Sequence, residues 1–315
     1  MSLGQPKGGV DQGPSAIRNA GLHSRLVADH WKVEDAGDVD FTRCAELGRE
    51  AAQKAAGGPS APPVSDSPHA HNSLAVGHAN YLVYKAASAA AQSGKFVLTL
   101  GGDHSIAVGS IAAILKARPE SVIIWVDAHA DINPPLASGS GNIHGMVLSF
   151  LMDLDHTRKS IAGFEWLDGE AVPRLDPSRL VYIGLRDLDW AEKQIIRNLN
   201  IKAFTMQDVD RLGMAAVMSS ALDHVTSGSR VARPIHLTFD IDSIDPMYAP
   251  STGTRVSGGL TYREAYFICE MAADTGLLAS MDLVEVNPSI NAEGGEQTIA
   301  MAVGLCASAM GNKIL

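Results

Sequence analysis

Short apolar runs alternate with longer amphipathic segments along the chain. Five runs have the length of a strand and are rich in leucine and β-branched residues, which predicts strands buried on both faces. They are FVLTL (96–100), VIIWV (122–126), LVYIGL (180–185), IHLTF (235–239) and LLASMDLVEV (277–286). Between them the apolar positions follow the helical period, and we predict helices over 77–93, 105–118, 192–199, 214–226, 262–275 and 297–310.

This alternation predicts an α/β fold: a mostly parallel sheet with helices on both faces, in three layers. We see no domain boundary and expect one catalytic domain over residues 1–315. In such a sheet, ligands bind at the carboxyl ends of the strands. Each predicted strand ends at polar, acidic or histidine residues, so we expect the functional site at that edge.

Composition narrows the class of protein. The 315 residues are 46% hydrophobic and 19% charged, which is typical of a globular protein with a large core. A net charge of −10 repels phosphate backbones, so we expect no nucleic acid partner. The longest apolar stretch, 298–310, is too short and too rich in small residues to span a bilayer. We therefore expect no membrane partner either.

Three cysteines, Cys44, Cys269 and Cys306, lie far apart without CxxC spacing, which argues against a disulfide framework. The N-terminal residues have neither a signal core nor a transit-peptide pattern. A cytoplasmic enzyme is the default expectation, and a mitochondrial one stays open. Residues 57–73 (GGPSAPPVSDSPHAHNS) predict a surface loop, in which we expect His69 and His71 to be solvated.

The strongest chemical signal is DAHAD at 127–131, directly after the second predicted strand. In an extended segment Asp127, His129 and Asp131 project to the same side. Asp240 and Asp242 repeat this spacing after another strand. Four carboxylates that converge at strand ends require positive charge, and these motifs contain no Lys or Arg. Metal is the favoured explanation, although a single D-x-D is more often a cap or turn.

His104 adds a second imidazole shortly after two glycines that allow close backbone packing. The GGDHS segment alone could be a strand-to-helix turn capped by Asp103 or Ser105. We expect Asp103 and Asp245 to be turn or supporting residues. Two His and four Asp exceed what one tetrahedral zinc needs, and they suit two ions with bridging carboxylates. Oxygen-rich ligation favours manganese, with iron, cobalt or zinc as substitutes.

Seven segments resemble the ureohydrolases, and the arginases in particular. In chain order they are GQPKGGVDQGPSAIRNAGL, LTLGGDHSIAVGSI, IIWVDAHADINPPLASGSGNIHG, VYIGLRDLD, TFDIDSIDP, STGTRVSGGLTYREA and LVEVNPSI. The resemblance implies a doubly wound α/β fold with two Mn²⁺ per subunit. It also implies hydrolysis of L-arginine to L-ornithine and urea, by attack of a metal-bridging hydroxide on the guanidinium carbon.

The resemblance also implies roles for the matching residues. One manganese would be bound by His104, Asp127, Asp131 and Asp240. The other would be bound by His129, Asp127, Asp240 and Asp242, so that Asp127 and Asp240 bridge. Asp131 would also accept a hydrogen bond from the hydroxide.

Glu285 resembles the glutamate that pairs with the guanidinium, since a carboxylate can accept from two of its N–H groups. A structural ion pair is its alternative reading. Thr254 would support Glu285. His144 matches the proton shuttle that protonates the leaving amine, and without the resemblance it would read as a hydrogen-bonded loop histidine.

Other matches concern the far end of the substrate. Asp189 and Glu192 match the groups that receive the α-ammonium, Glu192 through water. Asn133, Ser138 and Ser140 lie in the loop expected to meet the α-carboxylate. An analogue without the carboxylate would leave these donors unpaired. By composition alone they are ordinary loop residues.

Arg263 and Glu264 match interface residues of the family, so we expect a homotrimer. Relatives usually have a strand before the GQPKGGV segment and a longer C-terminal tail with an arginine. We therefore expect an edge or interior strand to be missing here, together with the tail contact.

Three rival readings stay open. An agmatinase or other guanidino-compound hydrolase would use the same metals, but SGSGNIHG together with RDLDWAE favours a substrate with both α-carboxylate and α-ammonium. A catalytically idle homologue is disfavoured because all six ligand positions, His144 and Glu285 are intact. A two-metal phosphoesterase would need Lys or Arg clamps, which the ligand motifs lack.

Overall fold

A computed structural model describes residues 1–61, 64–226 and 232–313. Within these residues six strands form one sheet in the order β1-β6-β5-β2-β3-β4, and all neighbouring pairs are parallel. The strands are β1 (Val97–Leu100), β2 (Val122–Val126), β3 (Leu180–Leu185), β4 (Lys202–Thr205), β5 (Ile235–Asp240) and β6 (Leu278–Val284). The predicted α/β fold with a parallel sheet is confirmed.

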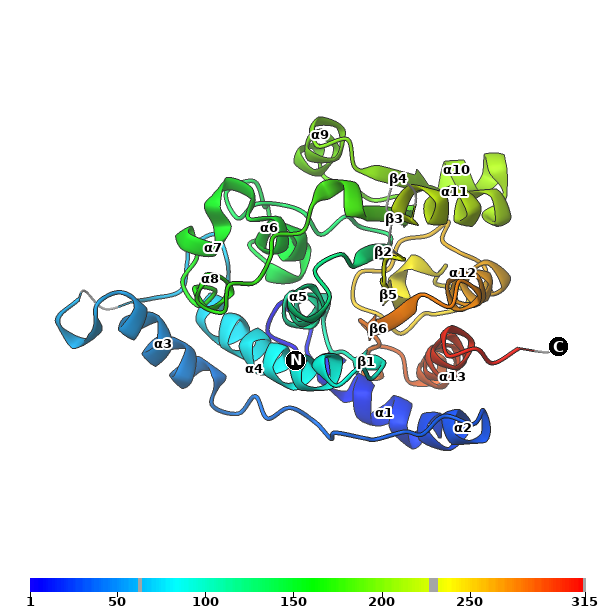
Figure 1. Ribbon diagram of the computed structural model, residues 1–315, viewed down its shortest axis with the longest axis horizontal. Coiled ribbons are helices and arrows are strands. Elements are labelled where there is room, and N and C mark those ends of the chain that lie inside the picture. The colour runs from blue at the N-terminus through cyan, green and yellow to red at the C-terminus, as the bar shows by residue number, and fades with distance from the viewer. Residues whose placement is uncertain (62–63, 227–231, 314–315) are drawn as a thin grey trace.

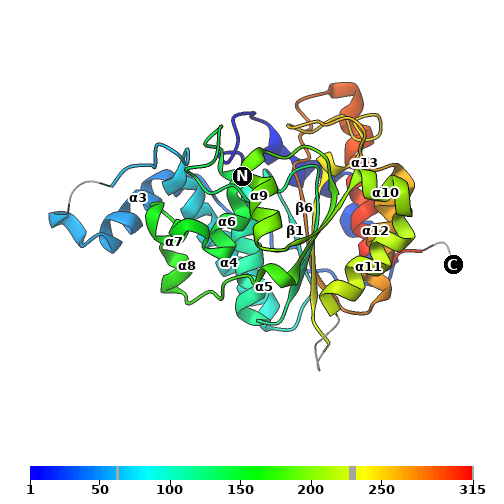
Figure 2. The same ribbon diagram turned by 90° about the horizontal axis from the view of Figure 1, so that it is seen from above.

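Helices cover both faces of the sheet, as Figures 1 and 2 show. The longer helices on one face are α4 (Ser73–Gln92), α5 (Ala107–Ala117) and α9 (Trp190–Asn198). The opposite face carries α10 (Met206–Leu212), α11 (Met214–Thr226), α12 (Tyr262–Asp274) and α13 (Ala292–Ala309). The other helices are α1 (Gly13–Asn19), α2 (Leu22–Ala28), α3 (Cys44–Ala55), α6 (Val147–Met152), α7 (Thr157–Ser160) and α8 (Trp166–Gly169). None of the described helices is long and apolar enough to cross a membrane.

The apolar run of β2 explains why the sheet lies at the centre. Ile123 and Trp125 belong to the core on the α4–α5 side, whereas Val122, Ile124 and Val126 belong to the core on the α11–α13 side. All five side chains are fully buried. A strand that packs against helices on both faces is apolar at every position, not at every second one.

One strand and several helices have no clear signal in the sequence. Strand β4 is an edge strand of four residues, KAFT, and three of them are only half-buried, so it lacks a continuous apolar run. Helix α3 has the sequence CAELGREAAQKA and buries only Cys44, Gly48 and Ala52. Cys44, Cys269 and Cys306 are all buried and free.

The direction in which the chain crosses the sheet changes between β2 and β5, the two neighbouring strands at its centre. From β2 the chain moves outward to β3 and β4, and it returns to β5, which lies on the other side of β2 and leads outward to β6. Adjacent strands whose connections run in opposite directions leave a crevice at their carboxyl ends. The DAHAD segment leaves β2 at this junction, and Asp240 ends β5 beside it.

Candidate metal centre and substrate pocket

Three carboxylates surround one ring nitrogen of His104, which lies just beyond the end of β1. Its Nδ1 is 3.1 Å from an oxygen of each of Asp127, Asp131 and Asp240. All four side chains are almost completely buried. Ligands about 2.1 Å from an octahedrally coordinated ion lie roughly 3.0 Å apart along each edge. These distances are therefore those of a set of ligands around one cation.

The orientation of His104 fits a metal ligand. Its Nε2 is 2.9 Å from the hydroxyl of Thr238, and its ring stacks on Trp125 with centroids 4.2 Å apart. Its buried Nδ1 has no hydrogen-bond partner among the described residues. A single proton on Nδ1 could serve only one of three oxygens, whereas a cation can be shared by all of them and the nitrogen. The donor set thus fits a divalent metal ion.

A second group forms around His129. Its Nδ1 is 3.4 Å from Oδ1 of Asp127 and 3.3 Å from Oδ2 of Asp242. Asp127 faces His104 with its other oxygen, Oδ2, so its carboxylate links the two groups. Both groups have the geometry of possible metal sites, and Asp240 belongs to the first of them. The predicted bridging role of Asp240 stays a prediction.

Thr254 supports a different carboxylate from the one predicted. Its hydroxyl donates to Oδ2 of Asp242 over 2.6 Å. Thr254 makes no hydrogen bond to Glu285 among the described residues, so its predicted support of Glu285 stays a prediction. The consequence is that Thr254 orients a candidate metal ligand.

The electrostatics of the cluster call for positive charge. Burial raises the pKa of Asp240 well above its usual range, and the charges of Asp242 and Asp127 raise it further. Burial lowers the pKa of His104, but the surrounding carboxylates outweigh this and raise it well above its usual value. Four buried or nearly buried aspartates with two imidazoles are stable only if protons or cations compensate them.

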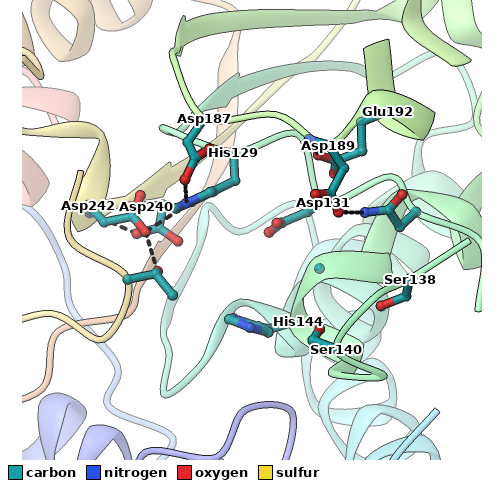
Figure 3. A pocket seen from close by; sticks show the side chains of 13 residues that line it. His129, Asp131, Ser138, Ser140, His144, Asp187, Asp189, Glu192, Asp240 and Asp242 are labelled. Atoms are coloured by element: carbon teal, nitrogen blue, oxygen red, sulfur yellow. Dashed lines mark hydrogen bonds and ion pairs between the residues drawn. The ribbon is translucent and has the colours of Figure 1, made fainter. Parts of the chain in front are cut away.

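A pocket opens above this cluster, and Figure 3 shows its lining from close by. His129, Asp240 and Asp242 lie at one end, and Ser138 and Ser140 lie at the other. The lining residues are His129, Asp131, Asn133, Ser138, Ser140, His144, Gly145, Asp187, Asp189, Glu192, Asp240, Asp242 and Thr254. Six of them are acidic and none is Lys or Arg, so the pocket favours a cationic ligand.

His144 projects into the pocket and is paired with a buried carboxylate. Its Nδ1 is 3.2 Å from Oε1 of Glu285. Burial lowers the pKa of His144, but the hydrogen bond and charge of Glu285 outweigh this and raise the pKa to about 9. The imidazole is therefore protonated at neutral pH and can donate a proton.

Glu285 lies behind His144 and is only 1% exposed. Its Oε1 also accepts from the backbone N–H of His104 (2.9 Å), and its Oε2 accepts from Nε2 of Gln5 (2.9 Å). Its φ of 64° is in the left-handed region, a strained conformation of the kind often found at functional sites. It does not line the pocket, so direct pairing with a guanidinium stays a prediction.

The far end of the pocket combines acidic groups with neutral donors. Asp189 and Glu192 form a capping box at the start of α9. Asn133 Nδ2 donates to Oδ2 of Asp189 over 2.8 Å. Burial raises the pKa of Glu192 to about 7. Ser138 and Ser140 face these groups from the loop between β2 and α6.

Comparison with known proteins decides the family. The family model described as "Arginase family" matches residues 1–311. The chain is 43% identical to rat mitochondrial arginase-2, over 99% of this chain and 82% of that protein. The chain belongs to the arginase family. The solved structure of arginase from Bacillus caldovelox is 38% identical to this chain, with a TM-score of 0.85, and the match covers 100% of this chain and 97% of that chain. A proclavaminate amidino hydrolase from Streptomyces clavuligerus is more distant, with 26% identity and a TM-score of 0.56 over 74% of this chain and 69% of that chain.

Two residues near the site of this family member were missed from sequence alone. Asp187 lines the pocket, and its Oδ2 is 3.9 Å from Nε2 of His129. It is the first acid after β3, and this position was a signal that could have identified it. Gln5 contacts Glu285 from the other end of the chain, a contact that local patterns do not reveal. Asp103 and Asp245 accept hydrogen bonds from nearby backbone N–H groups, so the prediction of turn residues is confirmed.

Proposed function

We propose that the chain is an arginase that hydrolyses L-arginine to L-ornithine and urea. The observation that carries this proposal is the pair of His–Asp groups joined by Asp127 at one end of an acidic pocket. The full-length likeness to named arginases supports it. The acidic pocket attracts the planar guanidinium cation of arginine. The acidic and neutral polar groups at the other end of the pocket would bind the α-ammonium and the α-carboxylate.

We further propose that two Mn²⁺ ions are the cofactors. His104, Asp127, Asp131 and Asp240 would bind one ion. His129, Asp127, Asp240 and Asp242 would bind the other. When bound, the ions would supply a water of lowered pKa as the nucleophile for the guanidinium carbon at neutral pH. The chain's own contribution is to hold the six ligands in place before any ion arrives.

Substrate orientation follows from the two ends of the pocket. The α-ammonium would lie beside Asp189, with Glu192 behind it. Ser138 and Ser140 would donate to the α-carboxylate. One N–H of Asn133 is already given to Asp189, so its second N–H remains for the carboxylate. This arrangement would direct the guanidinium toward Asp131 and the imidazoles.

His144 would act as the acid of the reaction. Its raised pKa keeps it protonated, and its contact with Glu285 fixes the ring from behind. The departing ornithine amine must gain a proton as the C–N bond breaks, and His144 would supply it from the pocket wall. Glu285 would thus contribute to the reaction by orienting His144 and by keeping its imidazole protonated.

A urea-release assay on L-arginine with manganese-loaded protein, combined with metal analysis of the same sample, tests this proposal. We expect His129→Asn to lower metal content and activity together, and His144→Asn to keep the metal and lose turnover. His23→Asn, at an exposed position on α2, is the matched control and should change neither. A higher kcat/KM for agmatine than for arginine would move the assignment to another guanidino-compound hydrolase.

We also propose that residues 1–315 act as one catalytic domain, that the subunits form a homotrimer, and that the chain works in the cytoplasm. The three buried free thiols support a reducing compartment. The relative from rat is named as mitochondrial, so fractionation of cells decides between the two compartments. Light scattering of the purified protein measures the oligomer, and a monomer would contradict the trimer.

A further inference from the structure

A short segment before α4 reaches the loop that carries Ser138 and Ser140. Asp66 Oδ1 accepts from the backbone N–H of Leu74 over 2.8 Å, which ties the segment to the first turn of α4. Asn72 Nδ2 donates to the backbone oxygen of Leu3 over 3.0 Å. Ala70 and Ser73 are fully buried. Residues 66–73 are therefore anchored on a 20-residue helix, although their composition predicted only a solvated loop.

His71 is the residue of this segment that contacts the pocket loop. Its backbone N–H donates to the backbone oxygen of Gly141 over 2.8 Å. Its ring lies directly against the same glycine: a Cβ at position 141 would be 2.7 Å from Nε2 and 2.9 Å from Cδ2 of His71. Gly141 has a φ of 70°, a conformation that glycine adopts readily. His71 is exposed, as expected, and its ring also contacts this glycine.

Gly141 and the next residue, Asn142, each contact one of the two serines. The backbone N–H of Gly141 donates to the hydroxyl oxygen of Ser138 over 3.1 Å, and that of Asn142 donates to Ser140 over 3.3 Å. Each hydroxyl accepts a backbone hydrogen bond and keeps its own proton free to donate. A shift of Gly141 would displace its own bond to Ser138 and, through the adjoining peptide, the bond of Asn142 to Ser140, and both serines line the same end of the pocket (Figure 3).

We propose that His71 is a positioning residue that sets specificity for substrates with a carboxylate at the end remote from the guanidinium. The proposal rests on the proposed function, because it assumes that Ser138 and Ser140 bind that carboxylate. His71 acts through Gly141: its ring fills the space beside the glycine and keeps the loop in the conformation in which both hydroxyls face the ligand.

Calorimetric binding of L-ornithine and of putrescine to the manganese-loaded full chain tests this, because the two ligands differ only by the carboxylate. We expect His71→Ala to weaken L-ornithine about tenfold and to leave putrescine within about twofold, since only the carboxylate contacts are lost. His71→Phe keeps a flat ring against Gly141 and should restore the affinity. His69→Ala, in the same exposed segment, is the matched control and should bind both ligands as the unaltered chain does.

Kinetics supply a second readout. In His71→Ala the KM for L-arginine should rise about tenfold while kcat is retained, and the KM for agmatine should stay unchanged. Gly141→Ala, which introduces a methyl group against the His71 ring, should raise the same KM. Equal weakening of L-ornithine and putrescine, or no weakening of either, would overturn the proposal. A chain that releases no urea from arginine but shows the expected ornithine–putrescine difference would refute the proposed function and leave this inference standing.

Discussion

The hydrogen bond between Thr254 and Asp242 leads to a specific prediction about metal binding. Thr254→Val keeps the shape of the side chain and removes the donor that lies 2.6 Å from Oδ2 of Asp242. A hydrogen bond to a charged group contributes about 1.5–3 kcal/mol. At about 1.4 kcal/mol per factor of ten, the loss corresponds to roughly 10- to 100-fold. Groups that orient metal ligands have effects of the same order.

We expect this loss in the affinity of the ion held by His129 and Asp242, with the ion held by His104 little affected. Titration of metal-free protein with Mn²⁺, followed by calorimetry or paramagnetic resonance, measures the two affinities separately. Activity at low manganese should fall and should return when manganese is raised. Substrate KM at saturating manganese should stay close to that of the unaltered chain.

Thr252→Val is a matched control for this experiment. Thr252 is also buried, and its hydroxyl has no hydrogen-bond partner in the part of the chain that the structure describes. The Thr252→Val variant should bind both metal ions with the affinities of the unaltered chain. If Thr254→Val binds both ions normally and instead raises the KM for arginine, Thr254 acts on the substrate and the reasoning from Asp242 is refuted.

Three further predictions concern protonation, packing and the thiols. Because Glu285 raises the pKa of His144 to about 9, the acid form is present below that pH and is lost above it, so activity should decline as pH rises through about 9. Glu285→Gln should move this decline to lower pH in a kcat–pH profile, and an unmoved profile would contradict the role of the pair. Phe150→Ala removes a fully buried ring that stacks on Phe164 with centroids 3.9 Å apart. It should lower the free energy of unfolding by about 3–5 kcal/mol in a denaturant titration, and a loss below about 1 kcal/mol would refute tight packing there. The three buried cysteines should react with a thiol reagent only after denaturation, and rapid reaction of the native chain would contradict their burial.

The sequence allowed the prediction of those parts of the fold that depend on local patterns. Strand β2 is apolar at each of its five positions and ends at DAHAD, so both the strand and its cluster of ligands could be predicted. Strand β4 could not, because a short edge strand with Lys202 carries little apolar signal.

The contacts of single side chains in the site were harder to predict. The carboxylate that Thr254 reaches depends on the path of a loop, and no spacing in STGT encodes that path. The contact of His71 with Gly141 joins two loops that are 70 positions apart in number and similar in composition to many solvated loops. Such contacts follow from tertiary packing, which periodicity does not record.

The contact of Gln5 with Glu285 has a consequence for how the active form arises. The two residues are 280 positions apart, and the backbone N–H of His144 donates to Gly4 in the same N-terminal segment. Closing a loop of that length is entropically unfavourable until the intervening core has formed. The N-terminal segment therefore helps to hold Glu285 and His144 in place, and a chain in which this segment has not docked lacks two of the contacts that fix the pair.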